Sequence, residues 1–349
     1  MSSASPAGPE QLRSVIFELT RRCNLSCRHC YNVWKNPWPY PVGDPDTAFT
    51  LRLLEKVLVK TGVQRVTLSG GEPLLRPDLP ELVDFLAAKN VSVNLITNGT
   101  LLDEPMIRRL TPGKIGVFEL PLLSVDRSVH DRMSGCEGAF DRTTLAVSEL
   151  KLAGAKIVGV FVATRDNIDR WKETAELGLA LGLDGLLFNR FNPGGAGGSH
   201  WNDLQAPPAL LQQALDEAEA FSEEYEFPIS CSIAMPPCLI KTDRYKRLTF
   251  GFCAAGTDRA YYTVDPLGNL RPCNHSPRIL GNLMSDTFAE LVRSEKMVSF
   301  MNARPDFCRE CRFELSCQGG CKAAAEACFG SPSRMDPFLQ TYHAMAQKL

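Results

Sequence analysis

Three cysteines stand close together near the start of the chain, in the stretch CNLSCRHCYN. Three residues separate Cys23 from Cys27, and two separate Cys27 from Cys30. A structural zinc ion takes four protein ligands, and a 4Fe-4S cluster held only by protein also takes four. The local set is therefore one ligand short. Either His29 or a distant cysteine completes a zinc site, or a cluster keeps one iron open to a ligand from outside the protein.

A second set of cysteines lies in the last third of the chain. Cys253 is followed by fourteen residues, Gly268, four residues and Cys273, and eight cysteines fall between Cys238 and Cys328. Eight thiolates would fill two four-cysteine sites, for either iron–sulfur clusters or zinc. The other members of the set follow the spacing CxxC-x5-C-x3-C and are Cys308, Cys311, Cys317 and Cys321.

The composition bounds where such sites would operate. The chain has 349 residues, 13 of them cysteine, and a net charge of -2 from 38 basic and 40 acidic residues. This balance predicts no broad surface for nucleic acid or for an acidic membrane. No apolar run approaches the length of about 20 residues that spans a membrane, and the start MSSASPAGPEQ lacks the features of a signal peptide. We therefore expect a cytoplasmic protein, in which clustered cysteines indicate metal binding or catalysis.

The elements that must position the first cysteines alternate between strand and helix. Six β-rich segments alternate with amphipathic segments, which is typical of parallel βαβ units with right-handed crossovers. Six units are too few for a closed eight-fold barrel, so an α/β fold with a partial barrel is expected. The predicted strands are 14–20, 64–69, 91–97, 114–124, 155–164 and 184–191, and the predicted helices are 47–61, 79–90, 103–110, 141–154 and 168–182.

Chemistry on such folds is found at the carboxyl ends of the strands. The loops CNLSCRHC, GGEP, TNGT, SVD and FNPGGAGG all follow predicted strands and would share one face. After an amphipathic helix at about 207–222 the alternation stops. We predict a flexible N-terminal segment at 1–13, a barrel domain at 14–230 and a cysteine-rich domain at 231–349.

The CxxxCxxC loop after the first strand, together with GGEP after the second, resembles the radical S-adenosylmethionine (SAM) superfamily. The resemblance implies a TIM-like partial (β/α)6 barrel in which Cys23, Cys27 and Cys30 bind a 4Fe-4S cluster. Its open iron would chelate SAM, whose reductive cleavage gives a 5′-deoxyadenosyl radical that removes a substrate hydrogen. The turn formed by Gly70, Gly71, Glu72 and Pro73 would bind the methionine end of SAM, with Glu72 accepting from the ammonium. The zinc alternative is disfavoured by GGEP in the same frame.

Further SAM contacts follow from the same resemblance. The family often has an aromatic residue between the second and third cysteines, near the adenine. Here that position is His29, with Tyr31 next to the third cysteine. Asn98 in TNGT, and Ser124 with Asp126 in SVD, occupy strand-end positions that resemble SAM or substrate contacts of related enzymes.

The C-terminal cysteines resemble the SPASM extension of these enzymes, which typically carries two auxiliary 4Fe-4S clusters. By that resemblance Cys253, Cys273 and Cys321 would bind the first cluster, with Cys238 as the additional ligand. Cys308, Cys311 and Cys317 would bind the second. The family's last cysteine usually stands near the position of DPFL, where this chain has Leu339 and no cysteine. Either Cys328 closes the second cluster, or that cluster has an open or non-cysteine ligand and Cys328 is a buried thiol.

The resemblance also suggests a reaction. SPASM proteins act mostly on peptides or proteins, so we expect oxidative maturation or crosslinking of such a substrate, with electrons from an external flavodoxin or ferredoxin. Sulfatase maturases have a proposed base, Asp, after the cysteine of the G-x4-C segment, where this chain has Asn274. An amide cannot accept a proton as a carboxylate does, so Asp258, Asp265 or His275 would have to substitute, and His275 has a suitable ordinary pKa.

Two alternatives to a peptide-modifying enzyme remain. The substrate could be a small molecule, such as a tetrapyrrole side chain or an aminocyclitol. The chain could instead be an iron–sulfur or zinc binding protein without radical chemistry. About thirteen residues precede the first predicted strand, so no leader-binding domain is expected and a peptide substrate would need a separate recognition protein. Neither nucleic acid nor membrane is an expected partner.

Overall fold

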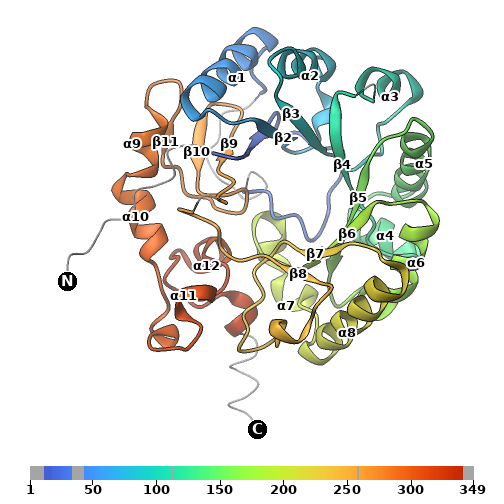
Figure 1. Cartoon of the computed structure of the whole chain (residues 1–349), viewed down its shortest axis with the longest axis vertical. Coiled ribbons are helices and arrows are strands. Elements are labelled where there is room, and N and C mark those ends of the chain that lie inside the picture. The colour runs from blue at the N-terminus through green and yellow to red at the C-terminus, as the bar shows by residue number, and fades with distance from the viewer. Residues whose placement is uncertain (1–11, 34–42, 112, 258, 341–349) are drawn as a thin grey trace.

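A continuous sheet organises the molecule. The computed structural model describes residues 12–33, 43–111, 113–257 and 259–340 (Figure 1), so the predicted flexible segment 1–13 lies outside it except for two residues. The sheet has eleven strands in the order β11-β10-β9-β1-β2-β3-β4-β5-β6-β7-β8. Its two end strands do not pair with each other, so the barrel is partial, as expected. The six predicted strands are β1 (Val15–Glu18), β2 (Arg65–Ser69), β3 (Ser92–Ile96), β4 (Ile115–Pro121), β5 (Ile157–Ala163) and β6 (Gly185–Arg190).

Strands β1 to β6 are each parallel to the next, with helices in the connections, so the predicted βαβ units are confirmed. The helices lie around the outside of the curved sheet (Figure 1). A short helix that the sequence did not predict, α4, follows β4 and precedes α5. The helices of this region are α1 (Thr47–Thr61), α2 (Leu79–Ala88), α3 (Glu104–Leu110), α4 (Arg127–Ser134), α5 (Ala139–Leu152), α6 (Trp171–Ala180), α7 (Trp201–Leu204) and α8 (Pro208–Tyr225).

The two faces of the strands differ in burial. Along β5, Ile157, Phe161 and the residues in phase with them are buried, whereas Val158, Val160 and Val162 are only half-buried. The buried set packs under the helices, where Trp171 contacts Phe161 with ring centroids 4.9 Å apart. Side chains alternate across a strand, so the half-buried set faces the inside of the barrel. The interior is therefore partly open to solvent.

The sheet continues beyond the six predicted strands. Strands β7 (Ile229–Cys231) and β8 (Thr249–Phe250) extend it past β6, so β7 spans the predicted boundary between residues 230 and 231. On the other side, β9 (Thr263–Val264) pairs with β1, and β10 (Asn269–Arg271) and β11 (Gly281–Asn282) complete that edge. Both edges of the barrel sheet are thus made by the cysteine-rich half of the chain.

Buried ion pairs join the C-terminal region to the barrel. Arg190 at the end of β6 pairs with Asp336 at 2.6 Å, and Arg271 of β10 pairs with Glu18 of β1. All four side chains are at most 4% exposed, so neither pair is screened by water. None of the described helices is long and apolar enough to cross a membrane. The C-terminal helices are α9 (Phe288–Val292), α10 (Glu295–Asn302), α11 (Glu314–Cys317) and α12 (Lys322–Phe329).

Candidate active site

The GGEP turn lies directly against the loop that carries the first cysteines. Gly71 N donates to Thr20 O, and Glu72 N donates to Arg22 O, both at 2.7 Å. A Cβ on Gly70 would lie 2.4 Å from Thr20 O, and one on Gly71 would lie 2.0 Å from Arg22 O. Gly70 also has φ +137°, which other residues rarely adopt. Only glycines allow this approach, and the approach fixes the chain just before Cys23.

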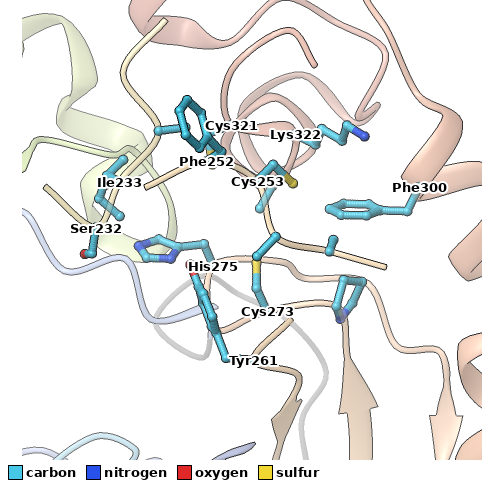
Figure 2. A pocket seen from close by; sticks show the side chains of 15 residues that line it. Ser232, Ile233, Phe252, Cys253, Tyr261, Cys273, His275, Phe300, Cys321 and Lys322 are labelled. Atoms are coloured by element: carbon cyan, nitrogen blue, oxygen red, sulfur yellow. The ribbon is translucent and has the colours of Figure 1, made fainter. Parts of the chain in front are cut away.

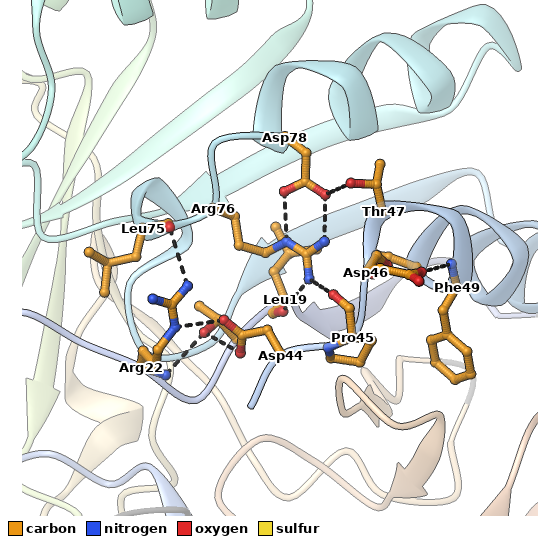
Figure 3. Close-up of polar contacts among 12 residues, drawn as sticks. Leu19, Arg22, Asp44, Pro45, Asp46, Thr47, Phe49, Leu75, Arg76 and Asp78 are labelled. Atoms are coloured by element: carbon orange, nitrogen blue, oxygen red, sulfur yellow. Dashed lines mark hydrogen bonds and ion pairs between the residues drawn. The ribbon is translucent and has the colours of Figure 1, made fainter. Parts of the chain in front are cut away.

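An arginine supports the turn from behind. The Arg76 guanidinium is buried and donates to Asp78, to Leu19 O at 3.3 Å and to Pro45 O at 3.0 Å (Figure 3). These acceptors belong to the end of β1 and to the segment that leads into α1. Arg22 likewise pairs with Asp44 at 2.7 Å. Three separate parts of the chain are thereby held around the turn.

Glu72 faces the end of β3. Its carboxylate is fully buried and accepts from Thr97 Oγ1 at 2.6 Å, Asn98 N at 2.8 Å and Leu74 N at 3.0 Å. Burial raises its pKa, while these donors act against the rise. Three hydrogen bonds already occupy most of the lone pairs of this carboxylate. The predicted contact with the SAM ammonium would have to use a lone pair that remains. In the described residues Glu72 connects the GGEP turn to the TNGT loop.

The cysteine loop is partly exposed and is covered on one side by the Gly-rich segment after β6. Gly197 N donates to Cys30 O at 2.9 Å, and a Cβ on Gly195 would lie 2.2 Å from Asn32 O. Cys30 N also donates to Cys27 O at 3.2 Å. The sequence placed FNPGGAGG on the active face, and its glycines allow it to contact the backbone of the cysteine loop.

A cavity opens beside this loop, inside the barrel. Its volume is about 1070 Å³, including space open to solvent. Six of the predicted site residues line it, namely Cys27, His29, Cys30, Tyr31, Asn98 and His275. Much of its remaining wall is apolar and comes from β3 to β6 and the residues that follow these strands. Of the residues predicted to bind the first cluster or SAM, Cys23, Gly70, Gly71, Glu72, Pro73, Ser124 and Asp126 do not line this cavity.

Ser124 and Asp126 have local partners. Asp126 is the N-cap of α4 and accepts from Ser128 N at 2.8 Å and Val129 N at 3.2 Å. Bonds from Ser128 and Val129 lower the pKa of this exposed carboxyl group. Ser124 Oγ is buried and accepts from Asp126 N at 3.1 Å. The SVD loop thus starts the helix that the sequence did not predict.

Tyr31 and His275 connect the two cysteine regions. Their rings stack with centroids 4.1 Å apart, and Asn274 Nδ2 donates to the Tyr31 hydroxyl at 3.1 Å. Burial raises the pKa of Tyr31 and lowers the pKa of His275 to about 3. His275 is therefore neutral at physiological pH and a weak proton acceptor, which disfavours its predicted role as a base.

Cys253, Cys273 and Cys321 line a second cavity next to the first (Figure 2). His275 and Ser232 line both cavities. Burial raises the pKa of Cys273 to about 12 and that of Cys321 to about 11, and repulsion between neighbouring thiolates adds to both shifts. Thiols this hard to ionise become thiolates when a metal binds them.

The remaining cysteines group differently from the prediction. The Cys238 thiol interacts electrostatically with Cys308, Cys311 and Cys317. Cys328, whose pKa burial raises to about 12, interacts with Cys321 and Asp336 instead. These interactions favour Cys238 as a partner of Cys308, Cys311 and Cys317, and they agree with the alternative that Cys328 is a buried thiol. Which thiols bind each cluster stays a prediction.

The three cysteine groups suit clusters better than single ions. Among the described residues, no three His, Cys, Asp or Glu side chains are grouped closely enough to bind one metal ion. In a 4Fe-4S cluster each cysteine binds a different iron, so its ligands stand further apart than the four around zinc. The partly exposed Cys23, Cys27 and Cys30 beside a large cavity also leave room for a ligand from outside the protein.

Comparison with known proteins also indicates iron–sulfur clusters. Residues 17–178 match the model of the radical SAM superfamily, and residues 253–313 match that of the SPASM iron–sulfur cluster-binding domain. The chain is 29% identical to the PqqA peptide cyclase of Gluconobacter oxydans (strain 621H), over 96% of this chain and 93% of that protein. It is 25% identical to the AdoMet-dependent heme synthase of Methanosarcina barkeri, over 93% and 95% of the two chains.

Solved structures show the same fold. The structure of Streptococcus suis SuiB bound to the precursor peptide SuiA superposes with a TM-score of 0.71 at 15% identity, over 94% of this chain and 76% of SuiB. Native anSMEcpe with bound AdoMet gives a TM-score of 0.71 at 17% identity, over 96% of both chains. By its matches to the two family models, the chain belongs to the radical SAM superfamily and is a 4Fe-4S, SAM-dependent enzyme whose SPASM region binds auxiliary iron–sulfur clusters.

Proposed function

We propose that this enzyme oxidises a peptide or protein substrate inside the barrel cavity. The observation that carries the proposal is the lining of that cavity, which includes Cys27 and Cys30 of the first cysteine loop together with His275, two residues from Cys273. A substrate there would lie between the radical source and an auxiliary cluster. The full-length similarity to a protein named as a peptide cyclase favours a peptide over a small molecule.

The SAM-binding residues that we propose are those predicted from the motifs. Cys23, Cys27 and Cys30 hold the cluster, which with bound SAM supplies the radical chemistry. His29 and Tyr31 border the adenine, and Asn98 orients SAM from the end of β3. The turn from Gly70 to Pro73 brings its backbone close to the methionine end, while Ser124 and Asp126 shape the neighbouring loop.

We also propose two auxiliary 4Fe-4S clusters with regrouped ligands. Cys253, Cys273 and Cys321 hold the one nearer the cavity, which leaves one of its irons without a cysteine. Cys308, Cys311 and Cys317 hold the other, with Cys238 as the fourth ligand. The support is the proximity of the thiols within each group. An external electron donor of the flavodoxin or ferredoxin type reduces the enzyme, and a separate protein assists in presenting the peptide.

The residues around the cavity have definable tasks. The half-buried apolar side chains of β4 and β5 exclude water from the substrate. The Tyr31 ring, held by the His275 stack and the Asn274 bond, separates the two cluster regions at a fixed distance. With its pKa lowered by burial, His275 is a weak proton acceptor, so it is not the base that we propose.

The test uses the reconstituted enzyme with SAM, dithionite and synthetic copies of the short peptides encoded beside its gene. We expect 5′-deoxyadenosine and a peptide whose mass falls by two hydrogen atoms, a change that no control without SAM shows. Formation of 5′-deoxyadenosine with every such peptide unchanged would overturn the proposal, and oxidation of a tetrapyrrole under the same conditions would replace it with the small-molecule alternative.

A further inference from the structure

One carboxylate in the barrel cavity has no role in the site described so far. Glu119 lies on β4 and faces inward with Pro121, in phase with the half-buried positions of that strand. On the neighbouring strand β3, Ile96 is its register partner and lines the same cavity. Among the described residues that line the cavity, Glu119 is the one carboxylate.

The Glu119 side chain is also without a partner. Its carboxylate makes no hydrogen bond and no ion pair with any residue of the described ranges, although its backbone oxygen accepts from Thr97 N at 3.1 Å. Burial alone raises the pKa of this group. Glu72, by contrast, has three donors around its buried carboxylate. A charge that is removed from water without a partner destabilises the folded protein, unless a ligand supplies the partner.

The other polar groups of the cavity do not supply that partner. Arg190 is the one arginine of the lining, and its guanidinium is engaged by Asp336 at 2.6 Å and by Ala234 O at 2.7 Å. His275 is neutral. Tyr31 interacts with Glu119 electrostatically, and the carboxylate raises the pKa of the phenol, so the two groups repel as anions. The Glu119 charge is thus free for a cation from outside the chain.

The surroundings of Glu119 indicate the shape of that cation. Apolar side chains from four strands or their ends line the same space, among them Ile96, Leu123, Val160, Val162 and Leu187. Such a wall buries a hydrocarbon stem favourably but offers nothing to a charged group. An ammonium or guanidinium at the end of an aliphatic stem fits both features, because the stem contacts the wall while the charge meets the carboxylate.

We infer that Glu119 binds a positively charged group of the substrate, namely the side chain of a lysine or arginine held in the barrel cavity. The inference rests on the proposed peptide substrate, since it assigns the class of side chain that such a peptide places there. The ion pair fixes the substrate by one end, so that carbon atoms of the stem or of a neighbouring residue lie next to bound SAM.

Equilibrium dialysis of the reconstituted, SAM-bound enzyme tests this inference with two defined probes. The probes are acetyl-glycyl-lysyl-glycinamide and its norleucine analogue, which keeps the aliphatic chain and lacks the ammonium. We expect the wild-type enzyme to bind the lysine peptide at least about tenfold more tightly, and Glu119→Gln to lower that ratio to about one. Glu119→Asp keeps the charge and should retain part of the preference.

Two controls isolate the cavity charge. Glu104→Gln removes an exposed carboxylate of α3, where Glu104 is 72% exposed, and should leave the ratio unchanged. Iron content and SAM affinity should be the same in Glu119→Gln and in the wild type. Equal binding of the two peptides by the wild type, or a preference that survives Glu119→Gln, would overturn the inference. A loss of SAM affinity in Glu119→Gln as large as the loss of the lysine preference would also overturn it, because Glu119 would then bind SAM itself.

A third probe separates this inference from the proposed function. If butylammonium binds more tightly than butan-1-ol and loses this advantage in Glu119→Gln, while neither peptide binds, then the Glu119 assignment holds and the peptide substrate is wrong. If the peptides encoded beside the gene are oxidised equally well by Glu119→Gln, the peptide substrate holds and the Glu119 assignment is wrong. Failure of every cationic probe to bind overturns the Glu119 assignment.

Discussion

The ring of Tyr31 stacks on the ring of His275, with centroids 4.1 Å apart and planes inclined by 29°. Tyr31 follows the third cysteine of the first cluster loop, and His275 lies two residues after Cys273 of the auxiliary group. The stack therefore joins the first cysteine loop to the segment that carries Cys273, beside the cavity. Asn274 strengthens it from the side through its bond to the Tyr31 hydroxyl at 3.1 Å.

The stack predicts different outcomes for two His275 variants. His275→Phe keeps an aromatic ring against Tyr31, whereas His275→Ala removes a contact of about 0.5 to 1.5 kcal/mol. With a peptide that the wild type modifies, we expect product per SAM cleaved to stay within about threefold in the Phe variant and to fall about tenfold in the Ala variant. An equal fall in product per SAM cleaved in both variants would instead show that an imidazole nitrogen is needed. That result would contradict a minor role for a nitrogen whose pKa is lowered to about 3.

The regrouped cysteines predict which thiols hold iron. With three 4Fe-4S clusters, the reconstituted enzyme should contain about twelve irons per chain. Cys238→Ser removes a proposed ligand and should lower the count towards about eight. Cys328→Ser should keep the wild-type count, and so should Cys136→Ser, whose thiol contacts Arg142 at 3.2 Å and belongs to none of the proposed ligand sets. Loss of iron in both Cys328→Ser and Cys238→Ser would restore the ligand set expected from the sequence, and full iron in Cys238→Ser would contradict both ligand sets.

The close approach at Gly71 predicts a loss of SAM binding when a methyl group is added. In Gly71→Ala the new Cβ would lie 2.0 Å from Arg22 O, so the backbone around the first cysteine must shift. Overpacking of this kind costs about 1 to 3 kcal/mol, which corresponds to a loss of SAM affinity of about 5-fold to 150-fold if the whole cost falls on the SAM-bound state. Gly198→Ala is the control, because nothing lies within 4 Å of its Cβ. Wild-type SAM affinity in Gly71→Ala would show that the turn adapts without affecting the ligand.

The sequence predicted those features of the structure that depend on a few adjacent residues. The CxxxCxxC loop, the GGEP turn and the alternation of strands and helices are local patterns, so the barrel and the first cysteine loop followed from the sequence. The neighbours of Cys238 did not, because they are fixed by how the segment between β7 and β8 crosses the C-terminal region, and its ligand role stays a prediction. Glu119 was also missed, although a lone acid inside the apolar strand KIGVFELP is itself a signal for a polar inward position.

The buried pair of Arg190 and Asp336 predicts a large effect on stability. Asp336→Ala leaves the guanidinium of Arg190, which is 1% exposed, without a counter-charge, a change that costs about 3 to 5 kcal/mol. It also removes the acceptor of Cys321 N at 2.7 Å. We expect the melting temperature of the reconstituted enzyme to fall by at least about 5 °C.

Two variants separate the causes of that effect. Asp336→Asn keeps an acceptor for Cys321 N and removes only the charge, so a loss as large as in Asp336→Ala assigns the effect to the ion pair. Asp306→Ala breaks a surface pair with Arg309 in which the side chains are 93% and 71% exposed, and it should change the melting temperature little. Similar losses for Asp306→Ala and Asp336→Ala would contradict the importance of burial.

The buried His130 predicts how stability depends on pH. Both of its ring nitrogens are without a partner among the described residues, and its ring lies edge-on to Phe140. Burial lowers its pKa from 6.5 to about 4, with the neighbouring Asp131 acting in the opposite direction. The unfolded chain therefore takes up a proton below pH 6.5 while the folded chain does not, so the folded state loses stability as the pH falls from 6.5 to about 4.

The variant His130→Leu tests this dependence because it has no imidazole to protonate. Between pH 7 and pH 5, the free energy of unfolding of the wild type should fall by about 2 kcal/mol more than that of the variant. Urea unfolding at pH 7 and pH 5 measures the free energy of unfolding of both proteins. Every other titrating group is common to the two. An equal fall in both proteins would therefore mean that His130 is protonated in the folded state.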